Sequence, residues 1–186
     1  MNRPQFQPEQ AREIARAFAS EGVEYVFIGK SAAILLGYPA VTQDVDVFPE
    51  KSPANGDRIV AALRRVGFEI VGELEDAIRR GKDFVQIKNG PFDVDLIFAP
   101  DGIESFAAAK ARSLDLDGFQ IANLRDIIAS KRASGREKDL LDLPLRHPAP
   151  HHWIPIKKKG QNLCVVIIVI LFYSFFFLSF FVVVSW

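Results

Sequence analysis

The chain has 186 residues, which is enough for one domain with a hydrophobic core and too few for two domains of usual size. Its 23 basic and 23 acidic residues cancel, so nothing attracts the whole molecule to nucleic acid and such a contact needs a local patch. The single cysteine excludes an internal disulfide, and the three histidines lack the spacing of a zinc site. Because the first ten residues also lack the apolar run of a secretory signal, we expect a cytoplasmic protein.

Hydrophobic periodicity and turn residues predict an α+β domain over residues 1–143, with helices flanking a mixed β-sheet. The expected elements, in chain order, are a helix at 8–20, a strand at 23–28, a helix at 31–36, a strand at 42–48, a helix at 59–66, strands at 68–71, 84–88 and 92–98, and helices at 103–111 and 124–143. Asn89 and Gly90 predict a tight hairpin turn between the last two strands.

The composition changes abruptly after residue 143. Residues 144–163 are rich in proline, histidine and lysine and predict a linker, because proline fits neither a helix interior nor a central strand. Residues 164–186 carry no charge and are long enough to cross a hydrocarbon layer of about 30 Å as a transmembrane helix. One interpretation is an apolar membrane tether with the lysines at 157–159 on the cytoplasmic side. The other is unrelated sequence read past a frameshift, because the tail contains no arginine.

Two pairs of aspartates are candidates for cation binding and catalysis. Asp44 and Asp46 lie two apart in a predicted strand, so both carboxylates project from one face, about 6 to 7 Å apart. Asp93 and Asp95 repeat this spacing in a later strand. Carboxylates held close together favour a cation, and Mg²⁺ binds such groups together with water and phosphate oxygens. The alternative is that each pair lies on the solvent face of an edge strand and has no function.

A strand, a glycine turn and a helix precede the first pair. Gly29, Lys30 and Ser31 offer backbone N–H groups at a helix start, an ammonium group and a hydroxyl, all of which can bind phosphate. The segment is not a P-loop, because the first glycine of that motif would fall at Glu24.

Residues 29–39 (GKSAAILLGYP) and 42–48 (TQDVDVF) together resemble the signature of the DNA polymerase β-like nucleotidyltransferase superfamily, particularly its small bacterial members related to minimal nucleotidyltransferases and abortive-infection toxins. Residues 94–97 match the later strand of that family, and residues 124–140 are similar to its closing basic helix. The resemblance covers residues 22–143. It departs at Lys30, where many relatives have glycine or serine, so this lysine either contacts a triphosphate or crowds the turn.

The resemblance implies a nucleotidyltransferase-like fold and assigns roles to particular residues. It implies Mg²⁺ ligands that also carry the catalysis, at Asp44, Asp46 and Asp95, with Asp93 as the alternative to Asp95. It implies nucleotide contacts at Gly29, Lys30, Ser31 and Lys131, although the basic residues of the last helix have a solvated face as their alternative role.

The implied activity is Mg²⁺-dependent transfer of a nucleoside monophosphate from a nucleoside triphosphate such as ATP to a hydroxyl of an acceptor, either a tRNA end or a protein side chain. The alternative is a module of the same fold without catalysis, acting as a regulatory or toxin–antitoxin component with a partner protein. A membrane partner is expected only if residues 164–186 are a genuine anchor.

Overall fold

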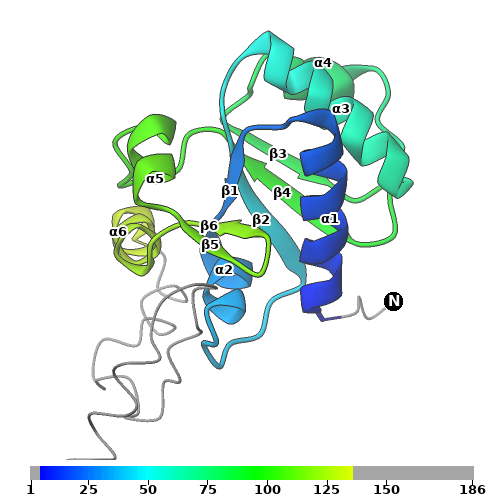
Figure 1. Ribbon diagram of the computed structural model, residues 1–186. Helices are drawn as coiled ribbons and strands as arrows, with labels where there is room; N and C mark the ends of the chain where they lie inside the picture. The colour runs from blue at the N-terminus through cyan, green and yellow to red at the C-terminus, as the bar shows by residue number, and fades with distance from the viewer. Residues whose placement is uncertain (1–4, 136–186) are drawn as a thin grey trace, which may run out of the picture. The chain divides into compact units, whose positions relative to one another are not determined.

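The computed structural model describes residues 5–135, in which helices and strands are interspersed along the chain (Figure 1). The helices are α1 (Pro8–Glu21), α2 (Gly29–Leu35), α3 (Pro53–Val66), α4 (Glu73–Arg79), α5 (Phe106–Arg112) and α6 (Leu124–Ser134). The strands are β1 (Tyr25–Phe27), β2 (Asp44–Pro49), β3 (Phe84–Ile87), β4 (Asp93–Ile97), β5 (Leu114–Leu116) and β6 (Phe119–Ile121).

The strands form one mixed sheet in the order β3-β4-β2-β1-β6-β5. β2 pairs in parallel with β4, and β1 pairs in parallel with β6, while the other neighbours are antiparallel. The prediction of a mixed sheet with flanking helices is therefore confirmed. β3 and β5 are the two edges, so β2 and β4 lie inside the sheet where their backbone groups are paired on both sides.

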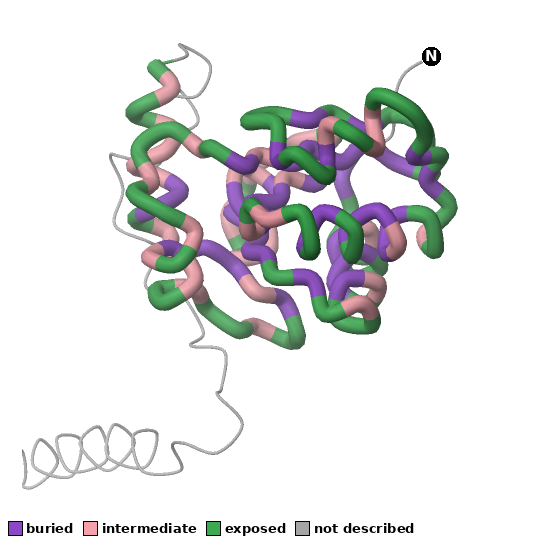
Figure 2. The backbone as a smooth tube through the Cα atoms, turned by 90° about the horizontal axis from the view of Figure 1, so that it is seen from above, coloured by how far each residue is buried: buried purple, intermediate pink, exposed green. Residues whose placement is uncertain are grey.

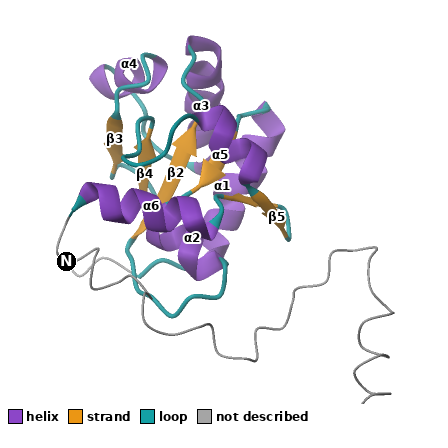
Figure 3. Ribbon diagram, turned by 90° about the vertical axis from the view of Figure 1, so that its left-hand side faces the viewer, coloured by secondary structure: helices purple, strands orange, loops and turns teal. Residues whose placement is uncertain are grey.

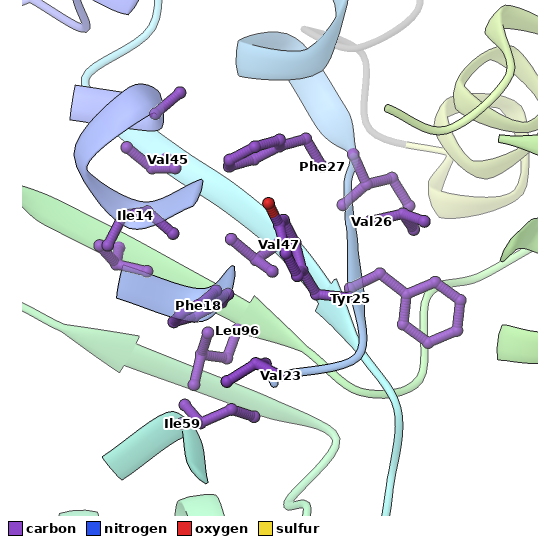
Figure 4. Close-up of a cluster of buried hydrophobic side chains, with 14 of the residues drawn as sticks. Ile14, Phe18, Val23, Tyr25, Val26, Phe27, Val45, Val47, Ile59 and Leu96 are labelled. Atoms are coloured by element: carbon purple, nitrogen blue, oxygen red, sulfur yellow. The ribbon is translucent and has the colours of Figure 1, made fainter. Parts of the chain in front are cut away.

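Helices α1 and α3 cover one face of the sheet. Ile14 and Phe18 of α1 lie four residues apart on one side of that helix, and both are fully buried. They meet alternate residues of β2 and β4 in the main hydrophobic cluster, together with Ile59 of α3 (Figure 4). Figure 2 shows that the buried segments run through the centre of the domain while exposed segments surround them.

The opposite face is covered only in part. Phe48 at the end of β2 packs edge-on against Phe106 of α5, with ring centroids 5.4 Å apart. α2 packs on β2, and α6 packs on α2 (Figure 3). These helices lie over one side of the sheet, so the face formed by β4 and β3 stays accessible next to α6.

Several elements differ from the sequence-based prediction. The run 68–71 is not a strand, because it leaves the end of α3 and packs the Phe68 ring against Phe92, with centroids 5.2 Å apart. α4, β5 and β6 were not predicted from the sequence, and the helix predicted from residue 103 begins at Phe106. β3 and β4 do form a hairpin, but residues 88–92 connect them in place of a tight two-residue turn. Gly90 is needed for space, because the ring of Phe68 occupies the position of a Cβ.

The predictions for residues 144–186, and for the last helix beyond Ser134, lie outside the described residues. Within residues 5–135, no helix is long and apolar enough to cross a membrane.

Gly56 allows α4 to pack closely on α3. A Cβ at Gly56 would lie 2.7 Å from the backbone Cα of Arg79 in α4. Alanine normally stabilises a helix interior by about 1 kcal/mol relative to glycine. We expect Gly56→Ala to destabilise the protein instead. The free energy of unfolding should fall by roughly 1–3 kcal/mol, because the backbone of α4 must move to make room for the Cβ. Urea unfolding measures this; an unchanged or higher stability would show that α4 does not pack on Gly56.

Candidate active site

Strands β2 and β4 place four aspartates on one face of the sheet. In their parallel register, Asp44 lies beside Asp93. Two residues further along, Asp46 lies beside Asp95. The alternate residues face the opposite side and are fully buried: Val45, Val47, Val94 and Leu96. Burial of this apolar row maintains the register, because a slip of one residue would turn the acids into the core.

The glycine turn lies directly against Asp46. Gly29 begins α2 with a φ of +69°, a left-handed conformation that favours glycine. A Cβ at this position would lie 2.5 Å from Oδ2 of Asp46. The absence of a side chain therefore allows the start of α2 to approach the carboxylate, which accepts hydrogen bonds from the backbone N–H groups of Lys30 and Ser31.

Ser31 joins α2 to β2. Its side chain is fully buried, and its Oγ accepts a hydrogen bond of 2.9 Å from the backbone N–H of Asp46. The hydroxyl lies 3.3 Å from the carbonyl oxygen of Ile28, to which it donates. These contacts make Ser31 a positioning residue for Asp46, whereas its direct contact with a nucleotide stays a prediction.

The acids repel one another and are partly removed from water. Burial raises the pKa of Asp46 to about 7, with the negative charge of Asp95 as the next largest cause. Burial also raises the pKa of Asp95 to about 6, followed by repulsion from Asp44, and a side-chain hydrogen bond from Gln86 acts in the opposite direction. Both shifts mean that the folded protein disfavours the charged carboxylates unless a cation accompanies them.

Asp95 has one oxygen held and one oxygen without a partner. Gln86 lies directly opposite Asp95 in the antiparallel pair of β3 and β4, and donates a hydrogen bond to its carboxylate. The other oxygen, Oδ1, is buried and accepts no hydrogen bond from any described residue. A buried acceptor without a donor is costly, so Oδ1 is suited to receive a proton or a cation.

The acids open into a cleft of about 530 Å³ between the sheet and α6. The cleft brings together most of the predicted site residues: Gly29, Lys30, Asp44, Asp46, Asp95 and Lys131. Ser31 and Asp93 do not line it. The second acid pair therefore contributes Asp95 to the cleft, while Asp93 is buried beside Asp44.

The cleft also contains residues that were not predicted as site residues: Asp83, Phe84, Gln86, Ile97, Asp101, Ser130 and Ser134. Phe84 and Gln86 could have been found, because they alternate with buried residues along β3 and so share a face with Asp95. The residues of α6 reach the cleft because Gly102, with a φ of +70°, lets the loop after β4 contact the helix backbone. A Cβ at Gly102 would lie 2.7 Å from the carbonyl oxygen of Ala129.

Comparison with known proteins identifies no family. No protein-family model matches the chain, and no curated protein matches it. Among solved structures, the chain is similar to TM1012 from Thermotoga maritima, described as a candidate nucleotidyltransferase, with 14% identity and a TM-score of 0.47 over 73% of this chain and 91% of that chain. It is also similar to JHP933 from Helicobacter pylori, with 17% identity and a TM-score of 0.39 over 66% of this chain and 53% of that chain. At such TM-scores neither similarity determines fold or function.

The carboxylates have the donor atoms that a divalent cation prefers, but they are not arranged around a single metal position. The donors are all oxygens, Oδ1 of Asp95 is unpartnered, and the carboxylates repel one another, which together favour Mg²⁺. Within residues 5–135, however, no group of three or more acidic, histidine or cysteine side chains is arranged to hold a metal ion. The residues therefore match the ion by type, and the carboxylates as they stand do not form a closed set of ligands.

Proposed function

We propose that the domain is a nucleotidyltransferase that uses Mg²⁺ and a nucleoside triphosphate. The observation that carries this proposal is the direct approach of the glycine turn at Gly29 to Asp46, in a cleft that also contains Asp44, Asp95 and two lysines. A carboxylate cluster alone would fit many cation sites. A carboxylate beside a helix start and lysines fits a cation that binds together with phosphate.

The residues have distinct proposed roles. Asp44, Asp46 and Asp95 would hold Mg²⁺, which when bound neutralises charge on the phosphates and the acids. Lys30 and Lys131 line the cleft and would neutralise the triphosphate. The acceptor hydroxyl attacks the α-phosphorus, the bond from that phosphorus to the bridging oxygen of the β-phosphate breaks, and pyrophosphate leaves.

Asp95 would also accept the proton that the attacking hydroxyl loses. Its Oδ1 is buried and without a donor, while Gln86 holds the carboxylate from the neighbouring strand. A buried carboxylate oxygen without a donor is suited to accept this proton when the attacking hydroxyl lies within hydrogen-bond reach. The acceptor would be an RNA end or a protein hydroxyl, and a toxin–antitoxin role with a partner protein rests on the family resemblance alone.

The direct test is nucleotidyl transfer. The full chain is incubated with each α-labelled nucleoside triphosphate, Mg²⁺ and cell extract, and labelled RNA and protein are separated on gels. We expect label on an acceptor with the wild type and none above background with the double variant Asp44→Ala/Asp46→Ala. Equal labelling by the two proteins would refute the proposal.

A second reading, from the family resemblance, is a binding module of the same fold without transfer. Melting temperatures with and without Mg²⁺ and ATP separate the two, because any ligand that binds the folded state stabilises it. Stabilisation by Mg²⁺ and ATP without labelling of any acceptor would identify the module.

A further inference from the structure

The cleft contains one exposed aromatic side chain that the proposed transfer reaction does not explain. Among residues 5–135, the large hydrophobic side chains that are exposed are Val41, Val71, Phe84 and Leu114. Only Phe84 of these lines the cleft, and it is 50% exposed. A ligand that covers the exposed half of this phenylalanine would gain hydrophobic stabilisation, because apolar surface would be removed from water.

The backbone around Phe84 holds this side chain in a defined position. Phe84 lies directly opposite Ile97 in the antiparallel pair of β3 and β4, and Ile97 also lines the cleft. The pairing continues beyond Phe84, because the backbone N–H of Phe98 donates to the carbonyl oxygen of Asp83 at 2.9 Å. Val85, the next residue, is buried on the other face, so Phe84 cannot turn inward without breaking the strand.

The position of Phe84 relative to Asp95 is set by the same register. Gln86 pairs with Asp95, and Phe84 lies two residues away on the same face, which is about 6 to 7 Å along the strand. That separation is comparable with the size of a ribose. A planar ring lying on Phe84 would therefore place an attached sugar next to Asp95, in the cleft that Lys30 and Lys131 also line.

We propose that Phe84 and Ile97 form a stacking surface for a nucleobase at the β3 end of the cleft. This inference rests on the proposed nucleotidyl transfer, since it is that reaction which brings nucleotides into the cleft. Stacking of a base on an aromatic side chain contributes about 1–3 kcal/mol, and it accepts any base because every base has a π face. The base belongs either to the nucleoside triphosphate or to the last nucleotide of an RNA acceptor.

The experiment measures the affinity of the full chain, with Mg²⁺ present, for ATP, for a short oligoadenylate and for inorganic tripolyphosphate, which has no base. Phe84→Ala is expected to weaken binding of a base-bearing probe about 5- to 100-fold and to leave tripolyphosphate unaffected. Phe84→Trp is expected to retain or improve the affinity. Leu114→Ala is the matched control, because it removes an exposed apolar side chain from the opposite edge strand, outside the cleft.

The pattern of losses identifies the source of the base and separates the two proposals. A loss confined to ATP assigns the base to the triphosphate, and a loss confined to oligoadenylate assigns it to the acceptor. Equal affinities of Phe84→Ala and the wild type for both base-bearing probes overturn the stacking surface, as does an equal loss for all three probes. A wild-type protein that binds none of the probes overturns the nucleotidyltransferase proposal itself.

Discussion

Asp46→Asn is expected to abolish transfer while making the protein more stable. The substitution keeps the size of the side chain and removes the charge that would bind Mg²⁺, so we expect transfer to fall by about 100- to 1,000-fold or more. The same charge is partly buried and lies beside other acids, so its loss relieves repulsion in the folded state. Opposite effects on activity and stability are a stronger test than either alone.

The stability gain has a defined pH dependence. Because the pKa of Asp46 is about 7 when folded, against an ordinary value of 3.8, the folded state binds the proton more tightly than the unfolded state. The free energy of unfolding contributed by this group therefore falls as the pH rises from about 4 to about 7, and stays low above that. We expect Asp46→Asn to be more stable than the wild type at pH 8, without divalent ions, by roughly 1–3 kcal/mol, and to differ little at pH 4.

Chemical unfolding at several pH values, with and without Mg²⁺, measures both effects. Mg²⁺ is expected to stabilise the wild type and to have little effect on Asp46→Asn. Asp76→Asn is the control, because it removes one negative charge from the exposed surface of α4, away from the cleft. A variant Asp46→Asn that is less stable than the wild type at pH 8 would show that repulsion does not govern this site.

Gly29→Ala is expected to abolish transfer, because the added Cβ would displace either the turn or the carboxylate of Asp46. The Cβ would lie 2.5 Å from Oδ2 and 2.7 Å from Cγ of Asp46, so the carboxylate or the turn must move. The left-handed φ of +69° adds a cost of about 1–2 kcal/mol for a residue with a side chain. We expect a loss of transfer of at least about 100-fold and loss of stabilisation by Mg²⁺, because a displacement near 1 Å at a reacting centre has effects of this size.

Gly22→Ala separates the clash from the backbone cost. Gly22 has a φ of +67° at the end of α1, and no atom lies within 4 Å of the position of its Cβ. Gly22→Ala should therefore lose only the stability that the left-handed φ costs, whereas Gly29→Ala should also lose transfer and the response to Mg²⁺ in melting experiments. If Gly29→Ala kept both, the close approach of the turn to Asp46 would have no role in activity.

Sequence patterns correctly predicted those features of the site that lie within one strand or one turn. Alternation along a strand correctly placed Asp44 and Asp46 on one face, and the glycine turn was found from its position between a strand and a helix. The pairing of β2 with β4 could not be read locally, because β3 and two helices lie between them in the chain. It is this pairing that brings Asp95 beside Asp46.

Short elements account for most of the misses. α4 has only seven residues, too few for a clear hydrophobic face, and it is held by its contact with Gly56. β5 and β6 have three residues each, although Asp117 and Gly118 between them are a recognisable turn pair and both have positive φ. The sequence did not show that Ser31 is fully buried and bonds to the backbone of Asp46, and its contact with a nucleotide stays a prediction.

Strands β2 and β4 each carry two sets of residues: an apolar set on the buried face and a carboxylate set on the cleft face. Substitutions in the two sets are expected to have opposite effects on stability. On one face, Val45 and Leu96 supply burial, so substitutions there reduce stability and leave the chemistry untouched until folding fails. On the other face, neutral replacements of Asp46 and Asp95 are expected to relieve repulsion and raise stability while removing the proposed activity. A scan of thermal stability should therefore give opposite signs for neutral replacements of Asp46 and for truncation of its neighbours Val45 and Val47. A protein that has lost the activity would be free to drift toward apolar residues on the cleft face, so carboxylates retained at these positions in distant relatives would record continued use.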